Sequence, residues 1–144
     1  MGENGMEKLF RPSSVAVIGA SQKKGKIGHD VLLNLIEYGY KGKIYPINPN
    51  DKEIMGLKAY PSVLEIKGDI DLAVFAIPAP TVPDVLKECG RKGVKAAIVI
   101  TAGFKETGPE GKKLETQLAE IGKEFGIRIL GPNCLGLICK ESLL

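Results

Sequence analysis

A segment rich in glycine and lysine follows the first apolar run of the chain, and its composition favours anion binding. Residues 14–28 have the sequence SVAVIGASQKKGKIG, with three glycines (Gly19, Gly25 and Gly28) and three lysines (Lys23, Lys24 and Lys26). Glycine lets the backbone approach a phosphate, and the first N–H groups of a helix point at it together with the positive end of the helix dipole. The lysines add positive charge. We therefore expect this segment to bind a nucleotide-like ligand.

The glycine spacing differs from that of dinucleotide-binding folds. Those folds carry the pattern G-x-G-x-x-G, whereas here the glycines lie at positions 19, 25 and 28. A loose glycine loop after an apolar strand is weak evidence alone. The alternative is a flexible connection whose lysines are only solvated.

Composition excludes several classes of protein. The chain has 144 residues, of which 44 % are apolar and 26 % charged, as is typical of a globular protein of one-domain size. Its net charge of +3 is too small to indicate nucleic-acid binding. The first ten residues lack the apolar core of a signal peptide, and no run has the length of a membrane span. We expect a cytoplasmic protein without nucleic-acid or membrane partners.

The histidine and cysteine content argues against a metal site or a disulfide framework. There is one histidine, and the three cysteines (Cys89, Cys134 and Cys139) form no C-x-x-C pair. An odd, scattered set of cysteines is typical of a reducing compartment. We expect no metal ligands. Abundant lysine and glutamate, with two glutamines and no tryptophan, favour a thermophilic source.

Strand and helix patterns alternate along the whole chain. Five short apolar runs are typical of buried parallel strands, namely Val15–Ile18, Lys43–Ile47, Leu72–Ile77, Ala96–Thr101 and Ile127–Leu130. Periodicity and end signals predict helices over Ile27–Tyr38, Thr81–Lys92 and Glu110–Phe125, with a shorter one over Pro61–Ile66. Thr107–Gly108–Pro109–Glu110 has the pattern of a capping box. The order predicts an α/β fold, a doubly wound, Rossmann-like parallel sheet of about five strands with helices on both faces.

Ligands of such sheets bind outside the carboxyl ends of the strands, so the residues after each strand are the candidate site. After the second strand comes Asn48–Pro49–Asn50, with no acid before Asp51. An NAD site would have Asp or Glu there to bind the ribose hydroxyls. Asparagine donors and the nearby Lys52 suit a ribose or adenine edge with an extra phosphate, as in NADP and coenzyme A.

The third predicted strand is followed by Pro78–Ala79–Pro80. Prolines in this position can serve only to end the strand. They can also form a rigid wall that lacks N–H donors, along which an apolar ligand arm such as pantetheine could lie. Both interpretations remain open.

Taken in order, five motifs closely resemble the amino-terminal coenzyme A-binding domain of the NDP-forming acyl-CoA synthetases. The motifs are SVAVIGAS, YPINPN, AIPAP, VITAGFKETG and ILGPNCLG. That family includes the alpha subunit of ADP-forming acetate–CoA ligase and, more distantly, that of succinyl-CoA synthetase. The resemblance runs from Leu9 to Leu137, and its VITAGF and GPNCLG pieces make it specific.

The resemblance implies coenzyme A or acyl-CoA as the ligand and assigns a role to each strand end. Gly19 and the loop Ser21, Gln22, Lys23, Lys24 and Gly25 would hold the phosphates. Asn48, Pro49, Asn50 and Lys52 would flank the adenosine end, and Pro78, Ala79 and Pro80 the pantetheine. Ile100, Thr101, Ala102 and Gly103 would line the floor of the site, and Asn133 would close it.

The chemistry of that family runs through a phosphohistidine on the next domain, so the resemblance implies no catalytic residue in this chain. We expect His29 to be a partly exposed helix residue near the ligand, not the phosphohistidine. We expect Cys134 to be a small packed thiol, because no base is available to activate it. The tail Ile138–Leu144 departs from the sequence that usually follows GPNCLG.

Three functions remain open. In the first, residues 1–144 form a single CoA-binding domain of an ADP-forming acyl-CoA ligase, whose remaining domains or subunits would be its partners. In the second, the chain is a freestanding CoA-binding protein with a regulatory role and no catalysis. The third, an NADP-binding domain, is disfavoured by the missing acid and by the GPNCLG ending.

Overall fold

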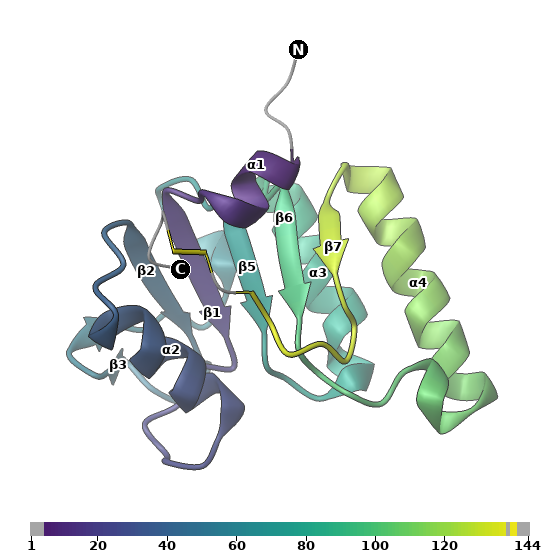
Figure 1. Cartoon of the computed structure of the whole chain (residues 1–144), viewed down its shortest axis with the longest axis horizontal. Helices are drawn as coiled ribbons and strands as arrows, with labels where there is room; N and C mark the ends of the chain where they lie inside the picture. Colours follow the sequence, from purple (N-terminus) through teal and green to yellow (C-terminus); the bar gives the residue numbers. More distant parts are fainter. Residues whose placement is uncertain (1–4, 138, 141–144) are drawn as a thin grey trace.

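Five parallel strands form the centre of the protein. The structure is a computed structural model that describes residues 5–137 and 139–140. The sheet has the order β2-β1-β5-β6-β7 and consists of β2 (Lys43–Ile47), β1 (Ser14–Ile18), β5 (Leu72–Phe75), β6 (Ala96–Val99) and β7 (Arg128–Leu130) (Figure 1). All four neighbouring pairs are parallel, which confirms the predicted sheet.

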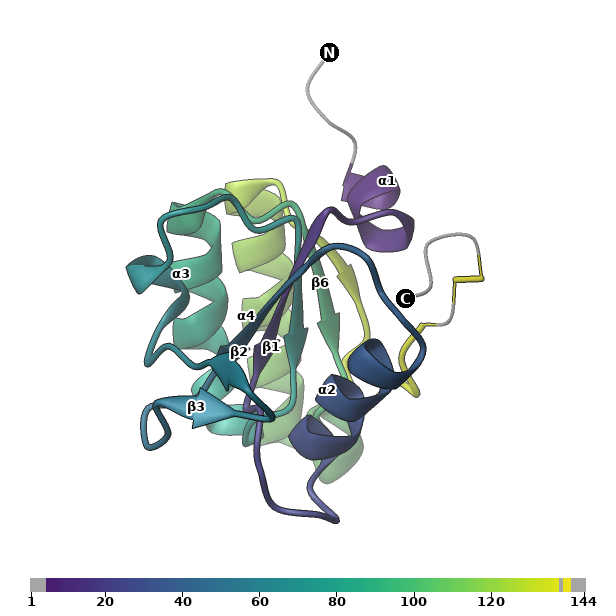
Figure 2. The same ribbon diagram turned by 90° about the vertical axis from the view of Figure 1, so that its left-hand side faces the viewer.

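Helices cover both faces of this sheet, as predicted (Figure 2). Side chains alternate along each strand, so one face packs on α1 (Gly5–Phe10) and α2 (Ile27–Glu37) and the other on α3 (Val82–Lys92) and α4 (Pro109–Phe125). The central strands β1, β5 and β6 are buried at every residue, because both of their faces are covered. None of the helices in the described residues is long and apolar enough to cross a membrane.

The strand order reverses direction beside β1. The chain passes from β1 to β2 on one side and then crosses to β5 on the other side of β1. The connections of β1 and β5 therefore diverge at their carboxyl ends, and a ligand of a doubly wound sheet binds at such a point. In Figure 1 the arrows place these ends at the lower edge of the sheet.

Several local predictions were wrong. The capping box is not formed, because the N-cap of α4 is Gly108, which has no side chain, and Thr107 donates its hydroxyl to the Phe104 carbonyl at 2.8 Å. The helix predicted over Pro61–Ile66 is only the 3-10 turn η1 (Val63–Glu65). β5 and β6 end two residues earlier than predicted, where the chain turns out of the sheet. The antiparallel pair β3 (Glu53–Ile54) and β4 (Leu57–Lys58) and the helix α1 had not been predicted.

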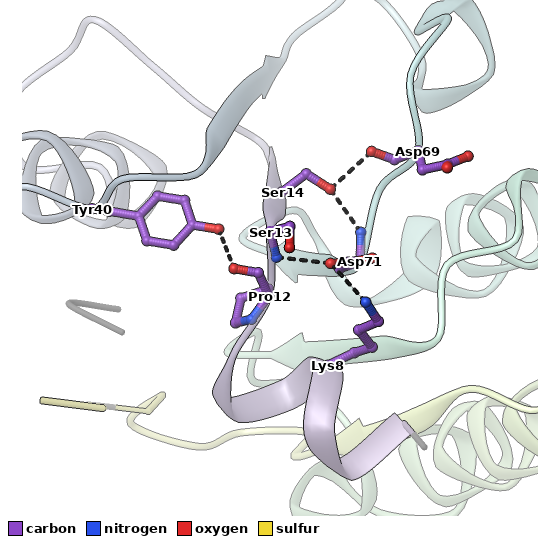
Figure 3. A network of polar contacts seen from close by, with 7 residues as sticks. All are labelled: Lys8, Pro12, Ser13, Ser14, Tyr40, Asp69 and Asp71. Carbon is purple, nitrogen blue, oxygen red and sulfur yellow. Dashed lines mark hydrogen bonds and ion pairs between the residues drawn. The ribbon is translucent and has the colours of Figure 1, made fainter. Parts of the chain in front are cut away.

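A network of polar contacts joins the amino ends of β1 and β5 (Figure 3). One carboxylate oxygen of Asp71 accepts from the Ser13 backbone N–H at 2.7 Å and from Lys8 Nζ at 3.2 Å. The Ser14 hydroxyl accepts from the Asp71 N–H at 3.0 Å. Because Lys8 belongs to α1, the network also holds this short helix against the sheet.

Candidate ligand-binding site

The loop after β1 leads directly into the N-terminus of α2. Gly19 begins the loop at φ +90° and donates its N–H to the Ile47 carbonyl at 3.0 Å. The Ser21 hydroxyl accepts from the Lys23 N–H at 3.0 Å. The N-cap of α2 is Lys26, whose side chain has no acceptor for the first N–H groups of the helix. The His29 and Asp30 N–H groups donate to the Lys26 carbonyl at 3.0 and 3.1 Å, so it is the N–H groups before them, those of Ile27 and Gly28, that are suited to an anion. An anion there would also meet the positive end of the helix dipole.

Gly28, in the first turn of α2, and Gly25, in the loop before it, have different surroundings. A Cβ atom added to Gly28 would lie 1.8 Å from the carbonyl oxygen of Gly19, so the start of α2 packs directly on the end of β1. Gly25 has φ +88° and would meet nothing within 4 Å. The close approach of backbone to backbone thus occurs at Gly28, which the sequence analysis had not placed among the site residues.

The basic residues expected to contact phosphates are free to reach one. Lys23, Lys24 and Lys52 are all exposed, as is Gln22. Exposed side chains are expected both in a ligand site and in a solvated loop. The conformation of the backbone around these residues is therefore the better guide to whether the loop binds a ligand.

At the end of β2, Asn48 connects two loops of the candidate site. Its Nδ2 donates to the Ala20 carbonyl at 2.9 Å, and its Oδ1 accepts from the Asn50 N–H at 2.8 Å. The side chain thus ties the loop after β1 to the turn after β2. Pro49 and Asn50 lie exposed in that turn.

The segment after β5 forms a short 3-10 turn, η2 (Ala79–Thr81). Pro78 and Pro80 are exposed, whereas Ala79 is buried in the core that faces α3. The Thr81 hydroxyl donates to the Pro78 carbonyl at 2.6 Å. The two prolines, and not Ala79, are therefore the residues that could face a ligand.

The loops after β6 and β7 are joined through Thr101. Its hydroxyl donates to the Ile77 carbonyl at 2.7 Å, and its carbonyl accepts from the Asn133 N–H at 3.0 Å. Asn133 is exposed at φ +55°, a conformation that asparagine tolerates better than most residues. Ile100 packs on the core that faces α2, and Ala102 is exposed.

These contacts connect the carboxyl ends of all five strands. Asn48 links β2 to the loop of β1, and a Cβ added to Gly19 would lie 2.2 Å from the Ala76 carbonyl oxygen beside β5. Thr101 links β5, β6 and β7. The predicted site residues therefore lie along one edge of the sheet, in the order of the strands.

Of three further residues near this edge, one required correction, one packs as expected and one had not been predicted. His29 is buried, with 8 % of its surface exposed, and its Nδ1 lies 3.2 Å from the Asp30 carboxylate. The expectation of a partly exposed histidine was wrong. Cys134 packs as expected and donates its thiol to the Val99 carbonyl at 3.4 Å. Glu106 was not predicted, yet its carboxylate accepts from the loop after β6, and backbone hydrogen bonds, that of Gly103 foremost, lower its pKa.

No group of three or more histidine, cysteine or acidic residues in the described part of the chain could hold a metal ion. The three cysteines are free thiols. The chemistry available at the edge is therefore that of backbone N–H groups, lysines and amides, which suits recognition of a phosphorylated ligand.

Comparison with known proteins identifies the family. Residues 13–140 match the family described as CoA binding domain. In an alignment 143 residues long, the chain is 56 % identical to the alpha subunit of ADP-forming acetate–CoA ligase I of Pyrococcus furiosus. The alignment covers 96 % of this chain and 31 % of that subunit. The chain therefore belongs to the CoA-binding domain family and is homologous to part of the ADP-forming acetate–CoA ligases.

Solved structures give the same result. The dinucleotide-forming acetyl-coenzyme A synthetase 1 of Ca. Korarchaeum cryptofilum superposes with a TM-score of 0.92 at 47 % identity, over 96 % of this chain and 30 % of that one. A conserved hypothetical protein from Pyrococcus furiosus superposes with a TM-score of 0.62 at 31 % identity, over 83 % of this chain and 91 % of that one. The chain thus spans less than a third of the two ligase relatives.

Proposed function

We propose that this chain is the coenzyme A-binding module of an ADP-forming acyl-CoA ligase and forms no acyl-CoA without the remaining domains or subunits. The family match over residues 13–140 supports coenzyme A as the ligand. The proportion of the ligase relatives that the chain covers supports a part of a larger enzyme. In this proposal residues 1–144 form one domain. Three free thiols support a reducing compartment, and the cytoplasm is the location we propose.

The observation that carries the proposed site is the contact between Gly28 and Gly19. Because backbone packs on backbone there, the first turn of α2 is held at the carboxyl end of β1, next to the point where the strand order reverses. In this proposal the pyrophosphate lies on the loop 19–25 and the N-terminus of α2, with Lys23 and Lys24 beside it. The adenosine lies near Asn50 and Lys52.

The pantetheine arm continues in this proposal along the sheet edge. It passes Pro78 and Pro80 and reaches the loop of Thr101 and Gly103, where Asn133 lies at the end of the site. Pro49, Ala79, Ile100 and Ala102 contribute backbone and packing there. Every contact that supports this path joins neighbouring strand ends.

Calorimetric titration with coenzyme A, dephospho-CoA, NAD and NADP tests the proposal. We expect coenzyme A to bind, and dephospho-CoA to bind more weakly, because exposed lysine and amide donors would contact the extra ribose phosphate. Tight NAD binding without a response to coenzyme A would refute the proposal.

A matched pair of lysine variants tests the site. Replacing Lys23 and Lys24 by alanine should weaken coenzyme A binding about tenfold, with a smaller loss at high salt, because exposed charges are screened. The control replaces Lys112 and Lys113, two adjacent exposed lysines of α4, by alanine. Equal losses in both double variants would mean that only the net charge matters.

A freestanding CoA-binding protein is the second candidate. The conserved hypothetical protein from Pyrococcus furiosus supports this candidate, since this chain covers 91 % of that solved chain. Adding the remaining domains of the ligase separates the two candidates. Acyl-CoA formation from acid, ATP and coenzyme A in the mixture would support the ligase module, and its absence would support the freestanding protein.

A further inference from the structure

The start of the loop after β6 is held by hydrogen bonds to the neighbouring strand ends. The Thr101 hydroxyl donates to the Ile77 carbonyl at 2.7 Å, and the Thr101 carbonyl accepts from the Asn133 N–H at 3.0 Å. These contacts fix Thr101 between β5 and β7. They do not reach Gly103 and Phe104, the residues that follow.

Three successive N–H groups of the loop donate to carboxylate side chains instead. The N–H groups of Gly103 and Phe104 both donate to Oε1 of Glu106, at an N–O distance of 3.0 Å for Phe104. The N–H of Lys105 donates to Oε2 of Glu115 in α4 at 3.3 Å. Carboxylates therefore hold the later part of the loop. Glu106 accepts two of these three hydrogen bonds.

The position of Gly103 determines how closely two walls of the site approach. Gly103 has φ +107°, and a Cβ atom added to it would lie 3.1 Å from Cβ of Ala79 in η2. The loop after β6 thus lies against η2 at its glycine. A movement of Gly103 would change the width of the site between the residues after β5 and those after β6.

Glu106 lies in the short 3-10 turn η3 (Lys105–Thr107), which comes before the N-cap of α4. An acidic residue in the first turn of a helix can reach back to the backbone N–H at the N-cap, as in a capping box. Phe104 is the N-cap of η3, so the Glu106 carboxylate accepts from the N-cap N–H and from the Gly103 N–H before it, both in the loop at the candidate site. Glu106 is exposed, so burial does not force this arrangement. The hydrogen bonds lower its pKa and favour the ionised carboxylate, which is the stronger acceptor.

We propose that Glu106 is a positioning residue for coenzyme A, whose carboxylate holds Gly103 and Phe104 in the conformation that the ligand requires. Glu106 acts on the loop and does not itself contact the ligand. This inference rests on the proposed coenzyme A binding. If the carboxylate is removed, the loop adopts other conformations, and the apparent affinity falls in proportion to the fraction of molecules that remain competent.

Three variants test the inference. Glu106→Ala removes both hydrogen bonds, and Glu106→Gln removes the charge but keeps one acceptor oxygen. Glu110→Ala is the matched control, since it removes a nearby exposed carboxylate whose contact is an ion pair with Lys113 at 3.2 Å. We expect the dissociation constant of coenzyme A to rise about fivefold in Glu106→Ala, as it would if one molecule in five kept the loop in place. The rise should be smaller in Glu106→Gln and absent in Glu110→Ala.

Amide hydrogen exchange at Gly103 and Phe104, followed by NMR without ligand, supplies an independent readout. Exchange should be faster in Glu106→Ala, intermediate in Glu106→Gln and unchanged in Glu110→Ala. Wild-type affinity in Glu106→Ala, or equal losses in Glu106→Ala and Glu110→Ala, would overturn the inference while leaving coenzyme A binding intact. A wild-type chain that does not bind coenzyme A would instead overturn the proposed function, and the inference with it.

Discussion

Replacing Gly28 by alanine is the change that most directly tests how the candidate site is built. A Cβ atom at this position would lie 1.8 Å from the Gly19 carbonyl oxygen and 2.6 Å from its carbonyl carbon. The first distance is about 1.6 Å short of the 3.4 Å at which ordinary van der Waals contact begins. Both clashing atoms belong to the backbone, so no side-chain rotation can relieve the overlap. Either α2 or the loop after β1 has to move.

Two opposing effects decide the sign of the stability change. Alanine is favoured over glycine within a helix by about 0.5–1 kcal/mol. Overpacking costs about 1–3 kcal/mol, and more where neighbours cannot adjust. We therefore expect Gly28→Ala to lower the free energy of unfolding by about 2 kcal/mol, which corresponds to a fall in melting temperature of roughly 5–10 °C for a chain of this size.

Gly122→Ala is the matched control for this experiment. Gly122 also lies in a helix, but there the added Cβ would meet first the end of the Ile129 side chain at 2.9 Å, which can move, and then the Ile127 carbonyl oxygen at 3.1 Å. The melting temperature of Gly122→Ala should change less than that of Gly28→Ala, and the affinity of Gly122→Ala for coenzyme A should equal that of the wild type. Gly28→Ala should bind coenzyme A about tenfold more weakly or worse, since displaced groups lose their alignment with the ligand. A Gly28→Ala protein that melts and binds like the wild type would refute this account.

Two further predictions concern groups outside the candidate site. Burial, and then the charge of Asp71, raises the pKa of Tyr40 from 10.0 to about 12. The unfolded chain therefore loses this proton first, and stability should fall as the pH rises from 10 to 12; the fall should be shallower in Tyr40→Phe, and equal slopes would contradict the assignment. Burial, and then Glu88, raises the pKa of the Cys89 thiol to about 12, and this thiol is fully buried. An alkylating reagent followed by mass spectrometry should modify Cys134 in the folded chain and Cys89 only on unfolding, so rapid native labelling of Cys89 would refute its burial.

The central sheet could be predicted because its strands are short apolar runs buried on both faces. β2 was predicted with its correct bounds, and β1 with an error of one residue. The errors at β5 and β6 have a physical cause. Ile77 and Ile100 continue the apolar pattern beyond the last paired residue, because they pack against the core from within the loops. Apolarity indicates burial, and the hydrogen-bond register alone determines where a strand ends.

The burial of His29 could have been inferred from its position in the predicted helix. Residues three apart lie on the same helix face, and Leu32 is among the most buried residues of α2. His29 is therefore carried towards the sheet. The role of Gly28 next to it had a similar signal, since the last glycine of a strand–loop–helix segment in such folds commonly allows the helix to pack closely on the strand.

Other features lay beyond the reach of sequence patterns. α1 has six residues and each strand of the β3–β4 pair has two, which is too few for a period to be detected. Their turn contains Met55 at φ +51°, a conformation that its residue type does not predict. The Glu106 carboxylate accepts from N–H groups two and three residues before it, and the pattern of residue types does not distinguish this turn from one with a solvated glutamate.

The two edges of the sheet are held by different kinds of contact, and this difference determines where substitutions can be tolerated. At the amino edge, ion pairing and hydrogen bonding by side chains, with Asp71 at their centre, join α1, β1 and β5 (Figure 3). At the carboxyl edge, backbone groups take part in every link between strand ends, and the lysines take part in none of those described. The charges of that edge are therefore available to a ligand without a cost in stability, because solvated lysines contribute little to folding. The backbone beneath them cannot change independently, since Gly28 serves the packing of α2 and the shape of the loop at once. Substitutions at Lys23 and Lys24 should accordingly alter binding alone, whereas a substitution at Gly28 should alter binding and stability together.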